Sequence, residues 1–393
     1  MTVRVNKPSF NIREKLSELG RKFGLKGSEL VAAETVQEAR DLVSAGRKNM
    51  VINGAMQVAQ RVPYPSTQPT VSYSNYYTVD RWRMNVSNAH FGTWTFSQSN
   101  TVPSGKGFAY SWKWDCQVAD TSLASDHYGI AEYRIEAQDL QHLGYGTSSA
   151  KPITLSFWVK TNKTGTYVFS IYANDGARYV SKTYTVNQAN SWEYKTITIE
   201  GDTAGTINND NGDGFRLWWW LGSGTNFSGG TMQPGVWRSW GSDQNGATPG
   251  LSVNMADSTS NEWFITGVQL EVGRNATDFE HRSYGEELAL CQRYFFKLSN
   301  SRLIMGYKRH DGSANFPVNT PVSMRVAPTP SLSTSGTFSN FQSSFSTTQS
   351  SPNVYEWSDT GNRFIFQVQS TWSSTHTYVP AWESFTAEFN SEL

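Results

Sequence analysis

The sequence predicts a mainly β fold: a jelly-roll β-sandwich, preceded by a short α-helical N-terminal segment and followed by a linker helix and a small second β domain. Aromatic residues make up 14% of the 393 residues although hydrophobic residues reach only 37%, and aromatic side chains favour strands. Several segments alternate apolar and polar residues at period two, and clusters rich in Gly, Asn and Asp separate them. Many short strands joined by long polar loops are typical of two-sheet sandwiches.

Residues 1–48 differ from the rest of the chain because they are rich in charged residues and Leu and contain no Trp or Tyr. Capping boxes at residues 11–14 and 35–38 predict two short helices, which are too short to be stable alone in water. They must therefore dock on the body of the chain, on copies of themselves or on a partner, and we expect an anchoring segment. The apolar residues of the two helices are Ile12, Leu16, Leu19, Val36, Leu42 and Val43.

Residues 49–283 form the predicted jelly-roll domain. The period-two pattern predicts strands over residues 153–160, 167–173, 215–221 and 263–272. Turn clusters such as Asn174-Asp175-Gly176 separate these strands.

A helix over residues 284–296 is predicted to link this domain to the second one. Ser283 and Glu286 form a capping box, and Leu288 and Cys291 begin an apolar face at helical spacing. Residues 297–393 return to a β pattern and are predicted to form the small C-terminal domain. Its last periodic strand spans residues 364–368.

Charge and cysteine content exclude several classes of protein. The 33 Lys and Arg residues balance 33 Asp and Glu residues, so a general nucleic-acid binder or a protein attracted to anionic membranes is not expected. The longest apolar run, residues 217–221, is far too short to span a membrane. No apolar core of a signal peptide follows Met1, so we expect synthesis in a reducing cytoplasm. Cys116 and Cys291 are then expected to be free buried thiols, with a single bridge as the alternative.

Signatures of enzymes are absent from the sequence. The chain contains no Gly-x-Ser-x-Gly, His-Glu-x-x-His or phosphate-loop motif, and its six histidines show no spacing typical of metal ligands. No catalytic residue is therefore predicted. Glycoside hydrolysis stays open, because it requires only two carboxylates across a cleft and sets no spacing between them in the sequence.

Aromatic side chains are the best local signal of a binding site. In the strand over residues 215–221, alternation places Leu217, Trp219 and Leu221 on one face. Arg216, Trp218 and Trp220 fall on the opposite face. Sugars have apolar C–H faces that stack on indole, whereas Arg and Asn bind hydroxyl groups. Burial in the core or in a subunit interface is the competing interpretation, because Tyr and Trp are also enriched at interfaces. The glycan-binding candidates are Arg216, Trp218, Trp220, Trp158 and Tyr172.

A weak calcium signal precedes this strand. Asn209, Asn211 and Asp213 alternate like the first ligands of a calcium loop, but Trp220 stands where an EF-hand requires a bidentate carboxylate. A turn is the competing interpretation, and no other cofactor is predicted.

Two parts of the predicted sandwich resemble the jelly-roll domain of fibre and appendage proteins of tailed bacteriophages. The first is Asn49-Met50-Val51-Ile52-Asn53-Gly54 through Arg61, followed by Asp80-Arg81-Trp82. The second is Gly267-Val268-Gln269-Leu270-Glu271-Val272-Gly273 with the Ala276-Thr277 stretch and the exit helix. Many relatives have Pro after Ala-Thr, where this chain has Asp278. Residues 4–16 are similar to the leader of marine phage virion proteins, and residues 316–329 to the second β domain of the same appendage proteins.

This resemblance implies a structural virion component without catalytic residues, located in the virion. It implies a homo-oligomer, of which a homotrimer is the expected form, anchored to other proteins of the tail or capsid through residues 1–48. The expected role is a tail-fibre adhesin that recognises a host surface glycan. The alternatives are a capsid-attached fibre or decoration protein and, in another class, a polysaccharide depolymerase.

Overall fold

The computed structural model describes residues 48–87 and 90–298 and, beyond them, residues 304–305, 307–308, 313–333, 337–340, 343–345, 353–356, 363–369, 381–383 and 386–393. The two predicted N-terminal helices, with Ile12, Leu16, Leu19, Val36, Leu42 and Val43, lie outside the described residues. Residues 49–393 form one compact unit. The predicted division of this unit at residues 284–296 stays a prediction.

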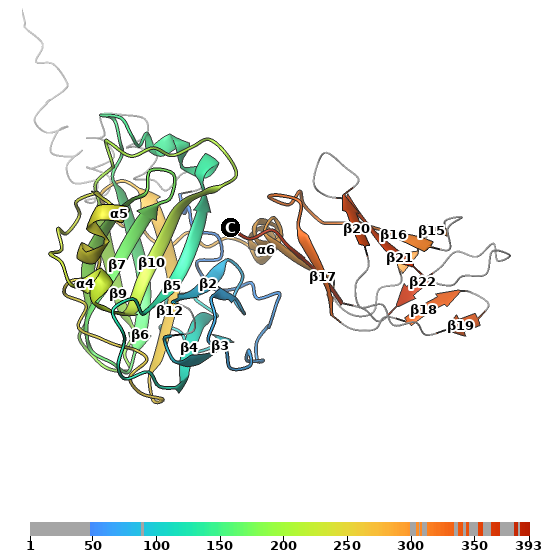
Figure 1. Ribbon diagram of the computed structural model, residues 1–393, viewed down its shortest axis with the longest axis horizontal. Coiled ribbons are helices and arrows are strands. Elements are labelled where there is room, and N and C mark those ends of the chain that lie inside the picture. Colours follow the sequence, from blue (N-terminus) through green and yellow to red (C-terminus); the bar gives the residue numbers. More distant parts are fainter. Residues whose placement is uncertain are drawn as a thin grey trace, which may run out of the picture. The chain divides into compact units, whose positions relative to one another are not determined.

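Two antiparallel sheets form a β-sandwich, as the sequence predicts (Figure 1). The seven-stranded sheet has the order β1 (Asn75–Tyr76), β2 (Trp82–Val86), β5 (Tyr128–Glu136), β10 (Asp213–Ser223), β7 (Gly165–Ala173), β8 (Arg178–Val186) and β11 (Arg238–Ser239). The five-stranded sheet has the order β3 (Thr93–Ser99), β4 (Ser111–Val118), β12 (Glu262–Val272), β6 (Ile153–Thr161) and β9 (Glu193–Ile199). The four predicted strands correspond to β6, β7, β10 and β12.

The core between the sheets combines aromatic rings with aliphatic side chains. Leu217, Trp219 and Leu221 of β10 point into it, as the alternation predicts. The centre of the Trp82 ring on β2 lies 5.4 Å from the ring centre of Trp219 and 5.2 Å from that of Tyr133. Because each ring buries a large apolar area, these rings contribute much of the apolar area of the core.

The opening segment and the closing strand of the sandwich, which carry the sequence resemblance, pair with each other. Met50 N donates to Leu270 O at 2.9 Å, and Val268 N donates to Gly54 O at 2.9 Å. Asn49 extends this pairing through its side chain, because Nδ2 donates to Val268 O and Oδ1 accepts from Leu270 N. These motifs are therefore structural, since they close the sandwich.

The linker helix α6 (Tyr284–Gln292) begins where the sequence predicts. The Ser283 side chain accepts a hydrogen bond from Glu286 N, which confirms the predicted cap. Cys291 on this helix and Cys116 on β4 are both buried and free, as expected. None of the helices in the described ranges is long and apolar enough to cross a membrane.

The chain beyond α6 contains short antiparallel strands in three small sheets. One sheet has the order β13 (Phe295–Leu298), β23 (Thr386–Asn390) and β17 (Thr329–Ser333). Another has the order β14 (Ile304–Met305), β22 (Ala381–Glu383), β18 (Thr337–Asn340) and β19 (Ser343–Phe345). The third has the order β15 (Tyr307–Lys308), β16 (Ser313–Asn319), β21 (Arg363–Gln369) and β20 (Asn353–Glu356). Strand β21 contains the predicted strand over residues 364–368.

A buried cation connects β2 to the C-terminal residues. The Arg81 guanidinium forms an ion pair with Glu392, and both side chains are almost fully buried. Its Nη2 atom donates to Arg134 O at 2.6 Å, and its Cζ atom lies 3.4 Å from the centre of the Tyr294 ring. Removing either partner of the ion pair would leave a buried charge uncompensated, which is strongly destabilising.

Candidate functional site

The outward face of β10 is buried, although not against the second sheet. Arg216, Trp218 and Trp220 leave the face opposite to the core, as the alternation predicts, but Trp218 is only 5% exposed and Trp220 only 1%. The interpretation of these indoles as an open platform is therefore corrected. They form a second, smaller cluster on the outside of the seven-stranded sheet with Ile130, Val168, Tyr179, Phe227 and Ala247.

The chain segment after β10 covers the outward-facing side chains of this strand. Residues 224–248 include the short helices α4 (Thr225–Ser228) and α5 (Trp240–Asp243) and the 3-10 turn η2 (Gln244–Gly246). This segment places Phe227 against Trp220, with ring centres 5.4 Å apart, and Trp240 against Trp218, with ring centres 5.1 Å apart. Thr248 N donates to Phe227 O at 2.8 Å, so a hydrogen bond within the segment also stabilises it.

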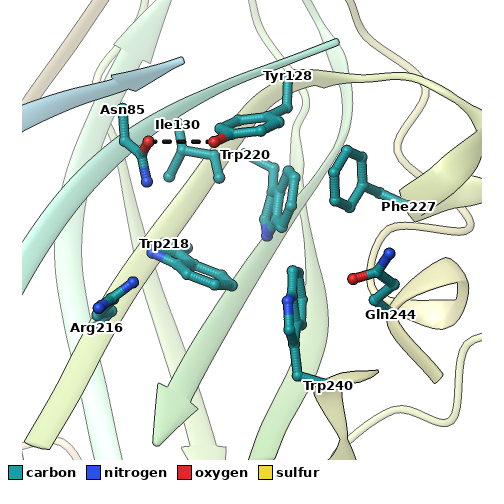
Figure 2. Close-up of a pocket in the computed structure, with 9 residues that line it drawn as sticks. All are labelled: Asn85, Tyr128, Ile130, Arg216, Trp218, Trp220, Phe227, Trp240 and Gln244. Atoms are coloured by element: carbon teal, nitrogen blue, oxygen red, sulfur yellow. Dashed lines mark hydrogen bonds between the residues drawn. The ribbon is translucent and has the colours of Figure 1, made fainter. Parts of the chain in front are cut away.

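The cover does not close completely, and a pocket of about 290 Å³ remains between it and the sheet. Figure 2 shows the aromatic rings of Trp218, Trp220, Trp240, Phe227 and Tyr128 arranged around this space. The lining residues are Asn85, Tyr128, Ile130, Arg216, Trp218, Trp220, Phe227, Trp240 and Gln244.

The indole rings of the pocket are held at fixed angles. The Tyr172 ring stacks on Trp218 with ring centres 5.1 Å apart and an angle of 5° between the planes. Trp220 stands almost perpendicular to Trp218, at 85°. The Trp220 Nε1 atom donates to Ser170 Oγ at 2.9 Å. The rings therefore present one preformed shape to a ligand, which lowers the entropy cost of binding.

Polar groups lie beside the rings. Arg216 donates from Nε to Asp213 Oδ2 at 2.6 Å and from Nη2 to Asn174 Oδ1 at 2.9 Å, which fixes its guanidinium. The Gln244 side chain has no hydrogen-bond partner within the described part of the chain, so its amide is free to bind a ligand. The Tyr128 hydroxyl lies 3.5 Å from Asn85 Oδ1, a distance too long for a strong hydrogen bond (Figure 2).

A buried carboxylate supports the pocket from β5. Glu132 accepts hydrogen bonds from Trp218 Nε1 and Asn85 Nδ2, each at 2.8 Å. Its other oxygen accepts from Arg83 Nη1 and Arg134 Nε, also at 2.8 Å. Burial alone would raise the pKa of Glu132, but the surrounding arginines and the Trp218 hydrogen bond outweigh it and lower this pKa. Glu132 is therefore ionised at neutral pH and orients two of the pocket's lining side chains.

The sequence-predicted site residues fall on both sheets. Arg216, Trp218 and Trp220 line the pocket, and Tyr172 packs behind Trp218. Trp158 lies on β6 in the five-stranded sheet and takes no part in the pocket. Sequence reasoning missed Asn85, Tyr128, Ile130, Phe227, Trp240 and Gln244. Aromatic residues inside the Gly- and Ser-rich stretch after β10 were the available signal for Phe227 and Trp240.

The loop of the predicted calcium site engages other partners. Asp213 Oδ2 accepts from Arg216 and lies 3.5 Å from Arg134 Nη1, while Asn211 Nδ2 donates to Arg325 O at 2.8 Å. Within the described ranges, no group of three or more His, Cys, Asp or Glu side chains is arranged to hold a metal ion. The calcium site at Asn209, Asn211 and Asp213 stays a prediction, and this geometry does not add to it.

Fold and pocket together define an antiparallel β-sandwich protein with an aromatic pocket on one outer face. No protein-family model matches the chain, and no curated protein matches it. Solved structures that the comparison finds include the enzymatically active domain of tailspike protein 4 of bacteriophage CBA120, at 12% identity and a TM-score of 0.29 over 57% of this chain. This chain spans only about a fifth of that tailspike chain, 21% of its length.

The comparison also finds a protein described as sugar-binding and a tandem CBM22 domain. A putative sugar binding protein from Bacteroides thetaiotaomicron is 10% identical with a TM-score of 0.31, over 57% of this chain and 100% of that one. The tandem CBM22 domains of Paenibacillus barcinonensis Xyn10C are 9% identical with a TM-score of 0.24, over 89% of this chain and 99% of that one. At such values, no residue role or ligand carries over from these structures to this chain.

Proposed function

We propose that this protein is a non-enzymatic glycan-binding subunit of a phage appendage, and that its outer pocket holds the sugar. The observation that carries the proposal is the pocket of about 290 Å³ walled by Trp218, Trp220 and Trp240 with Arg216 and Gln244 beside them. Apolar walls with a few placed polar groups are the general composition of small-ligand sites.

The chemistry of the lining suits a saccharide better than a purely apolar ligand. A pyranose ring offers C–H groups to the indole faces, while its hydroxyls reach the guanidinium of Arg216 and the amides of Asn85 and Gln244. The volume of about 290 Å³ lies just below the roughly 300–1,000 Å³ typical of ligand pockets. It therefore fits one sugar unit or a short branch rather than a long stretch of polymer.

The lining residues favour binding over hydrolysis. Glycoside hydrolysis uses two carboxyl groups that flank the scissile bond. None of the nine residues drawn around the pocket is Asp or Glu. Glu132 lies behind Trp218 and is held ionised by Arg83 and Arg134, so it is unsuited to act as a general acid.

The role in a virion is supported by the sequence resemblance alone. Under this proposal residues 1–48 anchor the chain to other tail or capsid proteins, and the β domains project as a homo-oligomer, in the expected form a trimer. A capsid-attached fibre is the alternative location.

The pocket is tested by replacing Trp240 with Ala. Because Trp240 belongs to the covering segment and is only half-buried, its loss should remove one wall and leave the sandwich folded. We expect glycan binding to weaken about tenfold, since the ligand loses both the apolar burial against the indole and a ring contact of about 0.5–1.5 kcal/mol. The measurement is binding of the full chain to an array of neutral fragments of bacterial surface polysaccharides.

Trp158→Ala is the matched control for the neutral fragments, because it removes a half-buried indole from the other sheet. If Trp240→Ala and the unchanged protein are both folded and bind the glycans equally, the pocket is not the glycan-binding site. Release of new reducing ends from a bound polysaccharide would establish a depolymerase in place of an adhesin.

The anchoring role is tested by deleting residues 1–48. We expect the truncated chain to fold, because residues 49–393 form a compact unit by themselves, but to be missing from assembled particles. The measurement is its abundance in purified virions relative to the full chain. Incorporation at the level of the full chain would overturn the anchoring role while leaving glycan binding untouched.

A further inference from the structure

The outer face of the five-stranded sheet carries a second group of rings, accompanied by lysines. Trp158 on β6 lies directly opposite Tyr194 on β9, and their ring centres are 5.2 Å apart. Two residues along β6, on the same face, Lys160 lies opposite Phe264 of β12. We call Lys106, Trp158, Lys160, Tyr194 and Phe264 the lysine–aromatic surface.

Two of the three rings of this surface remain accessible, whereas the third, Phe264, is only 4% exposed. Tyr194 is 44% exposed, and Trp158 is half-buried. Trp158 is therefore not part of the sandwich core, which lies on the other side of β6 among Leu155, Phe157 and Val159. A half-exposed indole beside an exposed tyrosine offers a flat apolar area that water covers poorly.

Two ammonium groups rest on these rings. Lys106 Nζ lies 5.5 Å from the centre of the Trp158 ring, and Lys160 Nζ lies 5.3 Å from the centre of the Phe264 ring. Such cation–π contacts hold an ammonium group above a ring without neutralising its charge.

These two lysines differ from their neighbours in their partners. Lys113 pairs with Glu262 at 2.6 Å and Asp115 at 3.3 Å, and Lys195 pairs with Glu193 at 2.6 Å. Neither Lys106 nor Lys160 forms an ion pair with a carboxylate in the residues that the structure describes. The surface therefore keeps two lysines without a carboxylate partner among the described residues, on a chain whose formal net charge is zero.

We propose that the lysine–aromatic surface is a second binding site, which takes an anionic polysaccharide with carboxylate-bearing sugars. Trp158 and Tyr194 stack against the sugar rings, and Lys106 and Lys160 pair with the carboxylates. The site lies on the opposite sheet from the pocket and does not depend on the function proposed for the pocket. Two free cations are too few for a nucleic acid, whose binding rests on many phosphate contacts.

The test measures retention of the full chain in gels that contain polygalacturonate, alginate or, as the neutral polymer, dextran. We expect retention by polygalacturonate or alginate and none by dextran. Trp158→Ala should weaken this binding at least about tenfold, and Lys160→Gln should weaken it several-fold, in line with desolvated cation–π and charge contacts. Added salt should weaken it further, because the pairing is electrostatic.

Two matched controls separate this site from the pocket and from general charge. Lys151→Gln removes an exposed lysine outside the surface, and Trp240→Ala opens the pocket. Both should bind the anionic polymer like the unchanged protein.

The proposal fails if neither anionic polymer retains the chain, or if dextran retains it equally. It also fails if Trp240→Ala abolishes retention while Trp158→Ala preserves it, or if single-stranded DNA binds at the same surface as tightly as polygalacturonate. If the pocket does not bind neutral glycans, the retention by anionic polymers still tests the lysine–aromatic surface.

Discussion

Replacing Glu132 with Gln is expected to lower the free energy of unfolding by about 3–5 kcal/mol, the range for breaking a buried ion pair by removing one partner. Glu132 is fully buried, and its carboxylate is shared by Arg83, Arg134, Trp218 Nε1 and Asn85 Nδ2. Gln keeps the shape and loses the charge, so the two arginines lose their compensation. Denaturant unfolding of the full chain measures the loss.

The pH dependence of this effect identifies its cause. The pKa of Glu132 is lowered in the folded protein, so the folded state binds its proton less readily than the unfolded chain. Its contribution is present above the unfolded pKa and is lost as the pH falls through the folded pKa. The difference between the two proteins should therefore be largest at neutral pH and should shrink in acid.

Glu200→Gln is the control for this substitution, because Glu200 pairs with Arg274 on the surface and both side chains are about 60% exposed. Surface pairs of this kind contribute little to stability. Equal losses from Glu132→Gln and Glu200→Gln would contradict a supporting role for the buried carboxylate. Glu132→Gln should also weaken glycan binding, because it releases Trp218 and Asn85.

Replacing Arg81 with Met is expected to have a comparable effect, a loss of about 3–5 kcal/mol. The Arg81 side chain is 1% exposed and that of Glu392 4%, so Met would leave a buried carboxylate without its closest partner. It would also remove the contact with the Tyr294 ring and the hydrogen bond to Arg134 O. Backbone amides of β13 and β23 should then exchange with solvent faster than those of β10.

The reciprocal variant, Glu392→Gln, separates the ion pair from the packing of the Arg81 stem. It leaves a buried guanidinium uncompensated and should destabilise the same strands, while Arg274→Met at the exposed pair should not. Unchanged exchange in β13 and β23 for both Arg81→Met and Glu392→Gln would show that the buried pair does not hold the C-terminal residues.

Much of the fold follows from local sequence patterns. Alternation in residues 215–221 places Leu217, Trp219 and Leu221 inward, and the Ser283 cap places the start of α6. These features depend on backbone geometry within a few residues, so a single chain segment contains the information.

The pocket could be predicted only in part. The pattern identifies Arg216, Trp218 and Trp220 as outward-facing, but it does not show what lies above them. Their burial results from Phe227 and Trp240, which arrive from a loop without periodicity. Glu132 was likewise not identified from the sequence. Arg83 lies opposite it only because β2 pairs with β5, and Arg134 contacts it from two residues further along β5.

The sequence by itself determined the β-sandwich class, the strands of its centre and the inward face of β10, with Leu217, Trp219 and Leu221. The tertiary structure decided that one aromatic face becomes a covered pocket while the other, with Trp158 and Tyr194, stays open. The physical reason is that period two fixes the direction of a side chain within its strand. What covers that side chain depends on loops and on strand pairings between residues far apart in the chain.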